Sequence, residues 1–263
     1  MTYAARPNPD GSRPVAAVTG ASSGIGAATA RKLAAAGFDV VVAARRLDRL
    51  ERLAAEIGGR AHALDVTDRA SVEAFAAQLP RLNVLVNNAG GALGMEPVAQ
   101  SVDEHWRTMW ETNVFGLMLV TRACLPALEA SGAGHVVNVG SIAGTESYPG
   151  GAGYTSAKHG VVAITETLRL ELLGKPIRVT EIDPGMVDTE FSAVRFGGDE
   201  ARARKVYEGL EPLLAEDIAD AIVWAVTRHP RVNVDHMRVT PLAQATATIA
   251  SRKAAVDRGG ALR

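Results

Sequence analysis

The chain alternates between short apolar runs and longer amphipathic stretches from residue 14 onward. The short runs are almost continuously apolar, which is typical of strands buried on both faces of a parallel sheet. The predicted strands cover residues 15–19, 40–44, 61–64, 84–86, 135–139, 177–182 and 232–239. Helical periodicity covers residues 25–36, 47–57, 71–78, 102–128, 157–173, 200–210 and 215–227. This repeated alternation predicts a single α/β domain with a doubly wound, seven-stranded parallel sheet of the Rossmann type.

The two ends of the chain do not follow this alternation. Residues 1–13 contain no apolar stretch, so we expect a disordered leader and no signal peptide. The domain itself is expected to span residues 14–243, with no linker that would divide it. The tail, residues 244–263, is rich in alanine and arginine. It is compatible with a helix, an arm on a neighbouring subunit or a disordered segment.

Composition excludes several classes of function. The net charge of −1 gives no strong field to attract nucleic acid or an anionic membrane. We find no apolar run long enough to span a bilayer, so a cytoplasmic location follows by elimination. The single cysteine, Cys124, excludes an internal disulfide framework, and we expect it to be a small buried apolar residue. The six histidines lack the spacing of metal ligands, so no metal site is expected.

A glycine-rich turn follows the first predicted strand and opens the next helix. It consists of Gly20, Ala21, Ser22, Ser23, Gly24, Ile25 and Gly26. Glycine suits such a turn because the backbone must approach a pyrophosphate closely and pack tightly against the sheet. The helix start offers unpaired N–H groups and a positive dipole end to the anion. A tight strand-to-helix connection without a ligand is the alternative reading of this turn.

Two arginines, Arg45 and Arg46, follow the second predicted strand. In a dinucleotide-binding fold an acidic residue at this place would bind the ribose hydroxyls of NAD. A guanidinium instead fits the 2′-phosphate of NADP, to which Ser22 and Ser23 would add hydroxyl donors. The alternative is that both arginines simply begin a solvated helix. We therefore predict NADP as the cofactor.

Further motifs carry a family resemblance. Asn87-Asn88-Ala89-Gly90 follows the fourth predicted strand, Ser141 follows the fifth, and Tyr154-Thr155-Ser156-Ala157-Lys158 lies in the next helix. Together with the glycine-rich turn, these motifs agree in type, order and separation with the short-chain dehydrogenase/reductase family. The chain resembles this family from residue 15 to about residue 242. The resemblance implies an oxidoreductase that moves a hydride between a nicotinamide and a carbonyl/alcohol pair.

The chemistry of these residues supports the same roles. Tyr154 and Lys158 are four residues apart on a helix and so share a face. Free tyrosine has a pKa near 10. We expect the nearby ammonium, together with an oxidised nicotinamide, to lower the pKa of Tyr154. Tyr154 would then serve as the acid/base, and Ser141 would hydrogen-bond the same substrate oxygen and hold it in line.

The resemblance also implies roles for other positions. Asn113 matches the family's fourth catalytic residue and would hold a water that links Lys158 to solvent. Lys158 would also hold the nicotinamide ribose. Asp65 and Val66 resemble the adenine-binding pair, although Asp65 is equally suited to cap the next helix. The expected cofactor-binding set is Gly20, Ser22, Ser23, Gly24, Ile25, Gly26, Arg45, Arg46, Asp65, Val66, Asn87, Ala89, Gly90, Tyr154, Lys158, Pro184, Gly185, Val187 and Thr189. The resemblance further implies a homotetramer.

The substrate class rests on two finer stretches, residues 92–97 and 189–196. Both resemble the bacterial NADP-dependent 3-hydroxy acid dehydrogenases, which oxidise serine or allo-threonine-like substrates. The substrate would contact Ser141, Tyr154 and Arg195, whose planar guanidinium suits a carboxylate. A surface ion pair is the alternative role of Arg195. Two other functions stay open: an NADPH-dependent reductase of neutral ketones, diketones or quinones, and an NADP(H)-sensing protein without catalysis.

Overall fold

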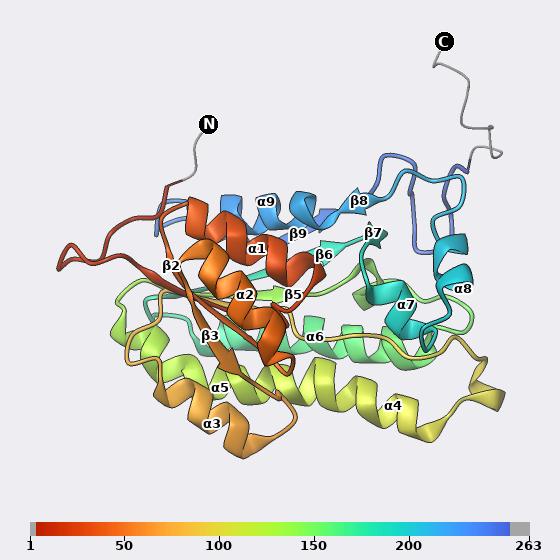
Figure 1. Cartoon of the computed structure of the whole chain (residues 1–263), viewed down its shortest axis with the longest axis horizontal. Coiled ribbons are helices and arrows are strands. Elements are labelled where there is room, and N and C mark those ends of the chain that lie inside the picture. Colours follow the sequence, from red (N-terminus) through yellow and green to blue (C-terminus); the bar gives the residue numbers. More distant parts are fainter. Residues whose placement is uncertain (1–3, 253–263) are drawn as a thin grey trace, which may run out of the picture.

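The computed structural model describes residues 4–252 (Figure 1). Within this range a parallel sheet of seven strands has the order β3-β2-β1-β4-β5-β6-β9. Its strands are β1 (Val15–Thr19), β2 (Asp39–Ala44), β3 (Arg60–Ala63), β4 (Val84–Asn87), β5 (Gly134–Val139), β6 (Ile177–Pro184) and β9 (His236–Val239). The predicted fold class is therefore confirmed.

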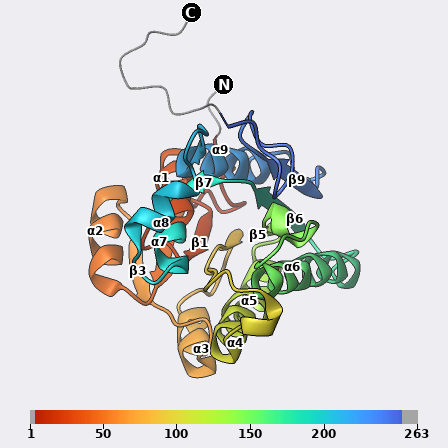
Figure 2. The ribbon, with the colours of Figure 1, turned by 90° about the vertical axis from the view of Figure 1, so that its right-hand side faces the viewer.

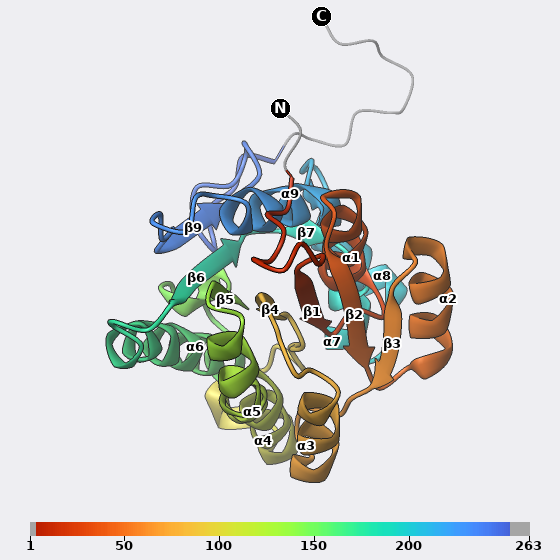
Figure 3. The ribbon, with the colours of Figure 1, turned by 90° about the vertical axis from the view of Figure 1, so that its left-hand side faces the viewer.

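Helices cover both faces of the sheet (Figure 3). One face carries α1 (Gly24–Ala35), α2 (Leu47–Ile57) and α9 (Ala215–Val226), and the other carries α3 (Arg69–Ala77), α4 (Asp103–Trp110), α5 (Gly116–Ala130) and α6 (Ala152–Glu171). Two apolar clusters result, one on each face, because the central strands contribute buried side chains to both. This is why the strands read as continuous apolar runs.

Some predicted boundaries differ from the structure. The helix predicted from residue 157 starts at Ala152, and the one predicted over 200–210 ends earlier, as α8 (Glu200–Lys205). The last strand is shorter than the predicted 232–239, because Asn233 and Val234 bond to β6 through a side chain and a carbonyl before regular pairing begins. Helix α7 (Phe191–Arg195) and the small pair β7 (Val187–Asp188) and β8 (Leu213–Leu214) were not predicted.

The predicted helix at 102–128 is one long rod, Asp103–Ala130, with a π-helical turn at Glu111–Phe115 between α4 and α5. By length and composition alone this rod is apolar enough to cross a membrane, which the sequence analysis did not anticipate. However, 56% of its most apolar window is buried inside the fold. Its apolar face packs on the sheet and contains Cys124, which is buried as expected.

Both ends of the described chain pack against the domain. The leader was expected to be disordered, but from residue 4 it has specific partners. Ala5 N–H donates to Ala36 O (2.7 Å), and the buried Asn8 side chain accepts from Asn83 Nδ2 (2.8 Å). Such polar anchoring leaves no periodic signal in the sequence. Residues 244–252 form an irregular segment closed by a bridge between Gln244 and Ala250, whereas 1–3 and 253–263 lie outside the described residues.

The strand order reverses between β1 and β4, whose connections leave toward opposite faces of the sheet. In open parallel sheets this switch point creates a crevice at the carboxyl ends of the strands. Figure 2 looks onto this end of the molecule, where α7 and α8 stand in front of the sheet. The fold therefore directs any ligand to the turns that the sequence analysis singled out.

Candidate functional site

A cavity of about 630 Å³ opens at the carboxyl ends of the strands. The expected site residues line it, with the exception of Gly26, Asn87 and Asn113. Helix α7 contributes Phe191, Val194 and Arg195, and the segment after α8 contributes Val206 and Tyr207. The strand ends, α7 and this segment thus enclose one continuous space, large enough for one end of a dinucleotide and a small substrate.

The glycine-rich turn leaves no room for side chains. A Cβ on Gly20 would lie 2.8 Å from Ala89 Cα, and a Cβ on Gly26 would lie 2.6 Å from Gly20 O. Gly20 also has a φ of +65°, a conformation that favours glycine. Ser23, at the N-cap of α1, makes no capping bond with its side chain, so it leaves the first N–H groups of the helix available to an anion. These features fit the pyrophosphate of a dinucleotide.

Asn88 holds this turn, although the sequence analysis did not select it. Its Nδ2 donates to Thr19 O (3.0 Å) and Gly20 O (3.3 Å). Thr19 Oγ1 accepts from the N–H groups of Asn88 and Ala89, both at 3.0 Å. Its neighbour Asn87, which we expected to bind the cofactor, instead donates to Thr121 and Asn138 inside the core. The sequence cannot show which of two adjacent asparagines faces the cavity.

The two arginines after β2 have different surroundings. Arg46 donates to Ser22 Oγ (2.9 Å), to Ser23 Oγ (2.8 Å) and to Glu190 Oε2 (3.0 Å). Arg45 makes none of these contacts, but its charge helps to lower the pKa of Asp65. Ser22, Ser23 and Arg46 form a ready donor set for a phosphate, as expected for the 2′-phosphate of NADP.

Asp65 does not cap the next helix. Its Oδ1 accepts from the N–H (3.0 Å) and the hydroxyl (2.7 Å) of Thr67, whereas Asp68 is the N-cap of α3 and accepts from Ala70 N–H. The capping alternative for Asp65 is therefore wrong. Asp65 and Val66 both line the cavity near the end of β3.

Tyr154, Lys158 and Ser141 come together at the other end of the cavity. Lys158 Nζ lies 5.9 Å from the centroid of the Tyr154 ring and donates to Val139 O (2.8 Å). Ser141 follows β5 and has its N–H bound to Asp183 Oδ1 (2.9 Å). The end of β5 and one face of α6 thus present a hydroxyl, a phenol and an ammonium to the same space.

The expected lowering of the Tyr154 pKa is not found in the chain by itself. Burial raises the pKa of Tyr154 well above its ordinary value, with a further contribution from Tyr148. A hydrogen bond with Ser141 and the charge of Arg195 oppose this rise but are smaller. Desolvation of the phenolate outweighs these contacts, so Tyr154 is a protonated phenol in this state.

Lys158 is buried near two buried acids, Glu181 and Asp183. Burial lowers the pKa of Lys158 to about 8, although Asp183 and Glu181 counteract this shift. Burial and Asp183 together raise the pKa of Glu181 to about 8, so Glu181 is largely protonated at neutral pH. Asp183 Oδ2 also contacts His236 Nε2 (2.9 Å). Asp183 therefore favours the ammonium form of Lys158 and fixes the backbone of Ser141.

Asn113 lies in the π-helical turn and stays behind the cavity wall. Its Nδ2 donates to Met109 O (2.8 Å) and to Gly91 O (2.9 Å), while its Oδ1 accepts from Gly91 N–H (3.1 Å). These bonds fix the loop after β4, where a Cβ on Gly90 would lie 2.5 Å from Asn113 Oδ1. The expected water between Asn113 and Lys158 stays a prediction.

Arg195 lies close to the phenols. Its Nε donates to Gly94 O (2.9 Å) and its NH1 donates to Tyr148 OH (3.1 Å). Its guanidinium carbon is 5.9 Å from the Tyr154 ring centroid. No carboxylate within residues 4–252 pairs with Arg195, so the surface ion pair considered from the sequence is absent from this part of the chain.

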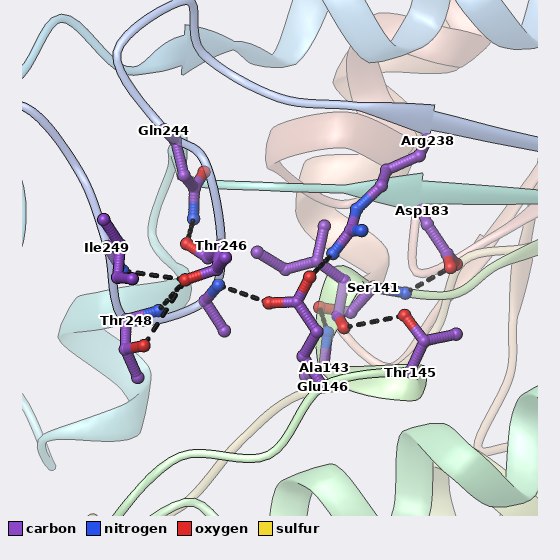
Figure 4. A network of polar contacts seen from close by, with 12 residues as sticks. Ser141, Ala143, Thr145, Glu146, Asp183, Arg238, Gln244, Thr246, Thr248 and Ile249 are labelled. Carbon is purple, nitrogen blue, oxygen red and sulfur yellow. Dashed lines mark hydrogen bonds and ion pairs between the residues drawn. The ribbon is translucent and has the colours of Figure 1, made fainter.

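The segment after β9 forms one wall of the cavity through Gln244 and Ala247. Gln244 Oε1 accepts from Met186 N–H (2.8 Å). Glu146 accepts from Ala247 N–H (2.6 Å) and pairs with Arg238 on β9 (Figure 4). No sequence pattern indicated this wall, because its residues are joined by polar contacts between distant segments.

Comparison with known families gives one broad match. The model described as short chain dehydrogenase matches residues 14–198, which includes the glycine-rich turn and the Tyr154–Lys158 pair. The match ends within the segment that carries α7 and α8.

Individual relatives match almost the whole chain. An uncharacterized oxidoreductase of Mycobacterium tuberculosis is 59% identical over 234 residues, which is 89% of this chain and 93% of the relative. A sulfoacetaldehyde reductase of Chromohalobacter salexigens is 44% identical, covering 89% and 96%. The NADP-dependent 3-hydroxy acid dehydrogenase YdfG of Salmonella typhi is 42% identical, covering 88% and 96%. The solved closed form of serine dehydrogenase complexed with NADP+ has a TM-score of 0.86 and 39% identity, covering 91% and 100%.

Proposed function

Because the chain belongs to the short-chain dehydrogenase family, as its motifs predicted, we propose that it transfers a hydride between NADP(H) and a small substrate that carries an anionic group. The substrate is an alcohol that is oxidised or a carbonyl compound that is reduced, and a 3-hydroxy acid is the first candidate. The observation that carries the substrate class is Arg195, which lines the catalytic cavity without a carboxylate partner among the described residues.

Ser141, Tyr154 and Lys158 support the reaction type. NADPH supplies the hydride when it is bound. In the direction of reduction, the phenol of Tyr154 donates its proton to the substrate oxygen, and the Ser141 hydroxyl hydrogen-bonds that oxygen. The burial that raises the pKa of Tyr154 keeps this proton in place until the oxygen becomes basic. The ammonium of Lys158 then stabilises the phenolate that remains.

NADP is favoured as the cofactor by residues at the opposite end of the cavity. Ser22, Ser23 and Arg46 would hold the 2′-phosphate, and the first turn of α1 would hold the pyrophosphate. The names of YdfG and of the solved serine dehydrogenase complex support this assignment. No acidic residue directly follows β2, where NAD would need one.

An anionic substrate is supported by chemistry at Arg195. A guanidinium close to Tyr154 can hold a carboxylate or sulfonate while the reacting carbon faces the phenol. Two relatives are named after compounds that contain such groups, a 3-hydroxy acid and sulfoacetaldehyde. Neutral ketones, diketones and quinones are the alternative, and apolar lining residues such as Met186, Phe191 and Val194 favour it.

The experiment compares matched substrates with wild type and Arg195→Ala. We expect wild type to use 3-hydroxy acids or sulfoacetaldehyde better than uncharged analogues, with NADP(H) better than NAD(H). Arg195→Ala should lose this advantage by about 10- to 150-fold, mostly in KM, because a charge-assisted bond contributes about 1.5–3 kcal/mol. Arg52→Ala, which removes an exposed guanidinium that pairs with Asp48 outside the cavity lining, is the control.

Two outcomes would change the proposal. Equal efficiency with charged and uncharged substrates would favour the neutral ketone class. Tight NADPH binding without turnover of any alcohol or carbonyl would favour a sensing protein, although the set of Ser141, Tyr154 and Lys158 argues against that.

The assembly and location are also part of the proposal. We propose a homotetramer, as the family resemblance implies, and the exposed apolar residues Trp110, Phe115, Leu170 and Leu173 support contacts between copies. A cytoplasmic location stays a prediction, which fractionation of the producing cell would test.

A further inference from the structure

Glu190 connects two parts of the cavity rim that are far apart in sequence. It is the N-cap residue of α7, and its carboxylate reaches the start of α2. Its Oε2 pairs with Arg46 NH1 (3.0 Å), and its Oε1 pairs with Arg49 NH1 (2.7 Å). These two guanidinium groups lower the pKa of Glu190, so the carboxylate is charged at neutral pH. One carboxylate thus holds α7 against the rim at which the adenosine end would bind.

Arg46 is also the arginine that Ser22 and Ser23 orient. Its Nε and NH2 bond to the two hydroxyls, and its NH1 bonds to Glu190. Every arm of this guanidinium therefore has an acceptor before any phosphate arrives. A 2′-phosphate bound by Ser22, Ser23 and Arg46 would bring a second anion to the group that Glu190 occupies. Two anions on one guanidinium repel each other, so the phosphate and Glu190 compete.

We propose that Glu190 competes with the 2′-phosphate of NADP for Arg46, so that binding of this cofactor loosens the contact of α7 with the adenosine end of the cavity. The proposal rests on the proposed function, because it requires NADP as the cofactor. Glu190 then limits the affinity for NADP but not for NAD, which lacks the 2′-phosphate. It also links the two ends of the site, since α7 carries Arg195 at its last turn.

The ion pairs of Glu190 are weak enough for a bound phosphate to break. The side chains of Arg46, Arg49 and Glu190 are 42%, 38% and 47% exposed, and ion pairs exposed to this degree are weak. A phosphate carries nearly two charges and more acceptor oxygens, so its bonds to the same groups are stronger. The ion pairs of Glu190 therefore hold α7 in the free chain, and the pair with Arg46 breaks when the phosphate binds.

The test measures equilibrium binding with two fragments of the cofactor, adenosine 2′,5′-bisphosphate and adenosine 5′-monophosphate. Only the first carries the 2′-phosphate, and neither needs turnover. Glu190→Gln should bind the bisphosphate about 3- to 10-fold more tightly than wild type, which corresponds to about 0.6–1.4 kcal/mol. Its affinity for the monophosphate should stay within twofold. Calorimetry gives both constants.

Two further variants act as controls. Glu56→Gln breaks another exposed carboxylate–arginine contact, between Glu56 and Arg31 (2.7 Å), outside the cavity lining, and should leave both affinities unchanged. Arg46→Ala should weaken bisphosphate binding and remove the effect of Glu190→Gln, because the group for which both anions compete is gone.

Hydrogen exchange gives a second readout. Adding the bisphosphate to wild type should increase exchange in residues 190–196, whereas Glu190→Gln should already show that faster exchange without ligand. Unchanged bisphosphate affinity in Glu190→Gln, or equal changes for both fragments, would overturn the competition. If Glu190→Gln weakened binding of both, Glu190 would instead bridge across the bound cofactor. Failure of wild type to bind NADPH or the bisphosphate would overturn the proposed function itself.

Discussion

Tyr154 enters the reaction as a phenol rather than a phenolate, because burial raises its pKa. Replacing it with phenylalanine removes the proton donor but keeps the ring that packs edge-on against Phe191. We expect Tyr154→Phe to keep its affinity for NADPH within about twofold and to lose about 10²–10⁴-fold in turnover. Equilibrium titration and steady-state kinetics measure the two effects separately.

A control for this prediction is Tyr207→Phe, which removes a hydroxyl that donates to Val187 O (2.8 Å) elsewhere on the cavity wall. Its turnover should fall by less than about tenfold. If Tyr154→Phe retained most of its turnover, another group would have to supply the proton.

Lys158 gives the site a pH dependence on the alkaline side. Burial lowers its pKa to about 8, so the ammonium is present below that pH and is lost as pH rises through it. We expect kcat/KM, which reports the free enzyme, to fall above about pH 8. Lys158→Arg should be slower but should lack this alkaline limb, since arginine stays charged. A profile between pH 6 and 10 that was flat for wild type would contradict this role.

Residues whose type is dictated by chemistry were predictable from the sequence, and residues defined by distant contacts were not. The glycine-rich turn, Ser141, Tyr154 and Lys158 each need one residue type at one spacing. Asn88, Glu190 and Gln244 act through partners that lie 58 to 144 positions away, and nothing local distinguishes them from surface polar residues. For the same reason the sequence could not show that the side chain of Asn87 bonds inside the core while that of Asn88 holds the turn.

At the scale of elements, the connection from β1 to α1 sets how closely a dinucleotide can approach. A methyl group on Gly26 would meet backbone atoms, Gly20 O at 2.6 Å and Ala21 Cα at 2.9 Å, which cannot yield as a flexible side chain does. We expect Gly26→Ala to cost about 1–3 kcal/mol of stability and to weaken NADPH binding. Thermal unfolding and titration measure both.

The matched control is Gly91→Ala in the loop after β4. A Cβ at Gly91 has no heavy atom within 4 Å, and its backbone is not left-handed. Because Gly91 lines the cavity, the two variants are compared in thermal unfolding, where Gly91→Ala should be close to wild type. Equal losses of stability in the two variants would mean that crowding by backbone atoms at Gly26 is not the cause of the loss.

Helices and strands with a strong hydrophobic pattern were predicted to within a few residues, whereas elements positioned by individual polar contacts were not. Strands β1 and β5 are continuous apolar runs, so their boundaries follow from burial alone. Helix α7 is five residues long, and the contacts of Glu190 and Arg195 at its ends fix its place. The start of β9 depends on Asn233, whose side chain replaces a backbone pairing.

At the scale of the whole molecule, the rod from α4 to α5 and the end of α6 expose apolar side chains. Trp110 and Phe115 are 42% and 48% exposed, and Leu170 and Leu173 are 76% and 86% exposed. We expect these faces to be covered by other copies of the chain, and light scattering at micromolar concentration should give a tetramer. Phe115→Glu should shift the mass to smaller species because it would bury a charge.

A surface substitution elsewhere, such as Arg52→Glu on α2, should leave the mass unchanged, since Arg52 is 72% exposed and pairs only with Asp48 among the described residues. A monomeric wild type would contradict the assembly and would leave the exposed apolar residues without an explanation.

The late position of β9 in the chain has a consequence for synthesis on the ribosome. Roughly 50 residues separate the end of β6 at Pro184 from the start of β9 at His236, which takes about 3–10 s to translate. During that interval the outer edge of β6 lacks its neighbour and is open to pairing with other chains. The wall at Gln244 and Ala247 emerges later still. A nascent chain can therefore complete its nucleotide end while the substrate end is unfinished, so chaperone binding at this edge would protect the chain when it is most prone to aggregate.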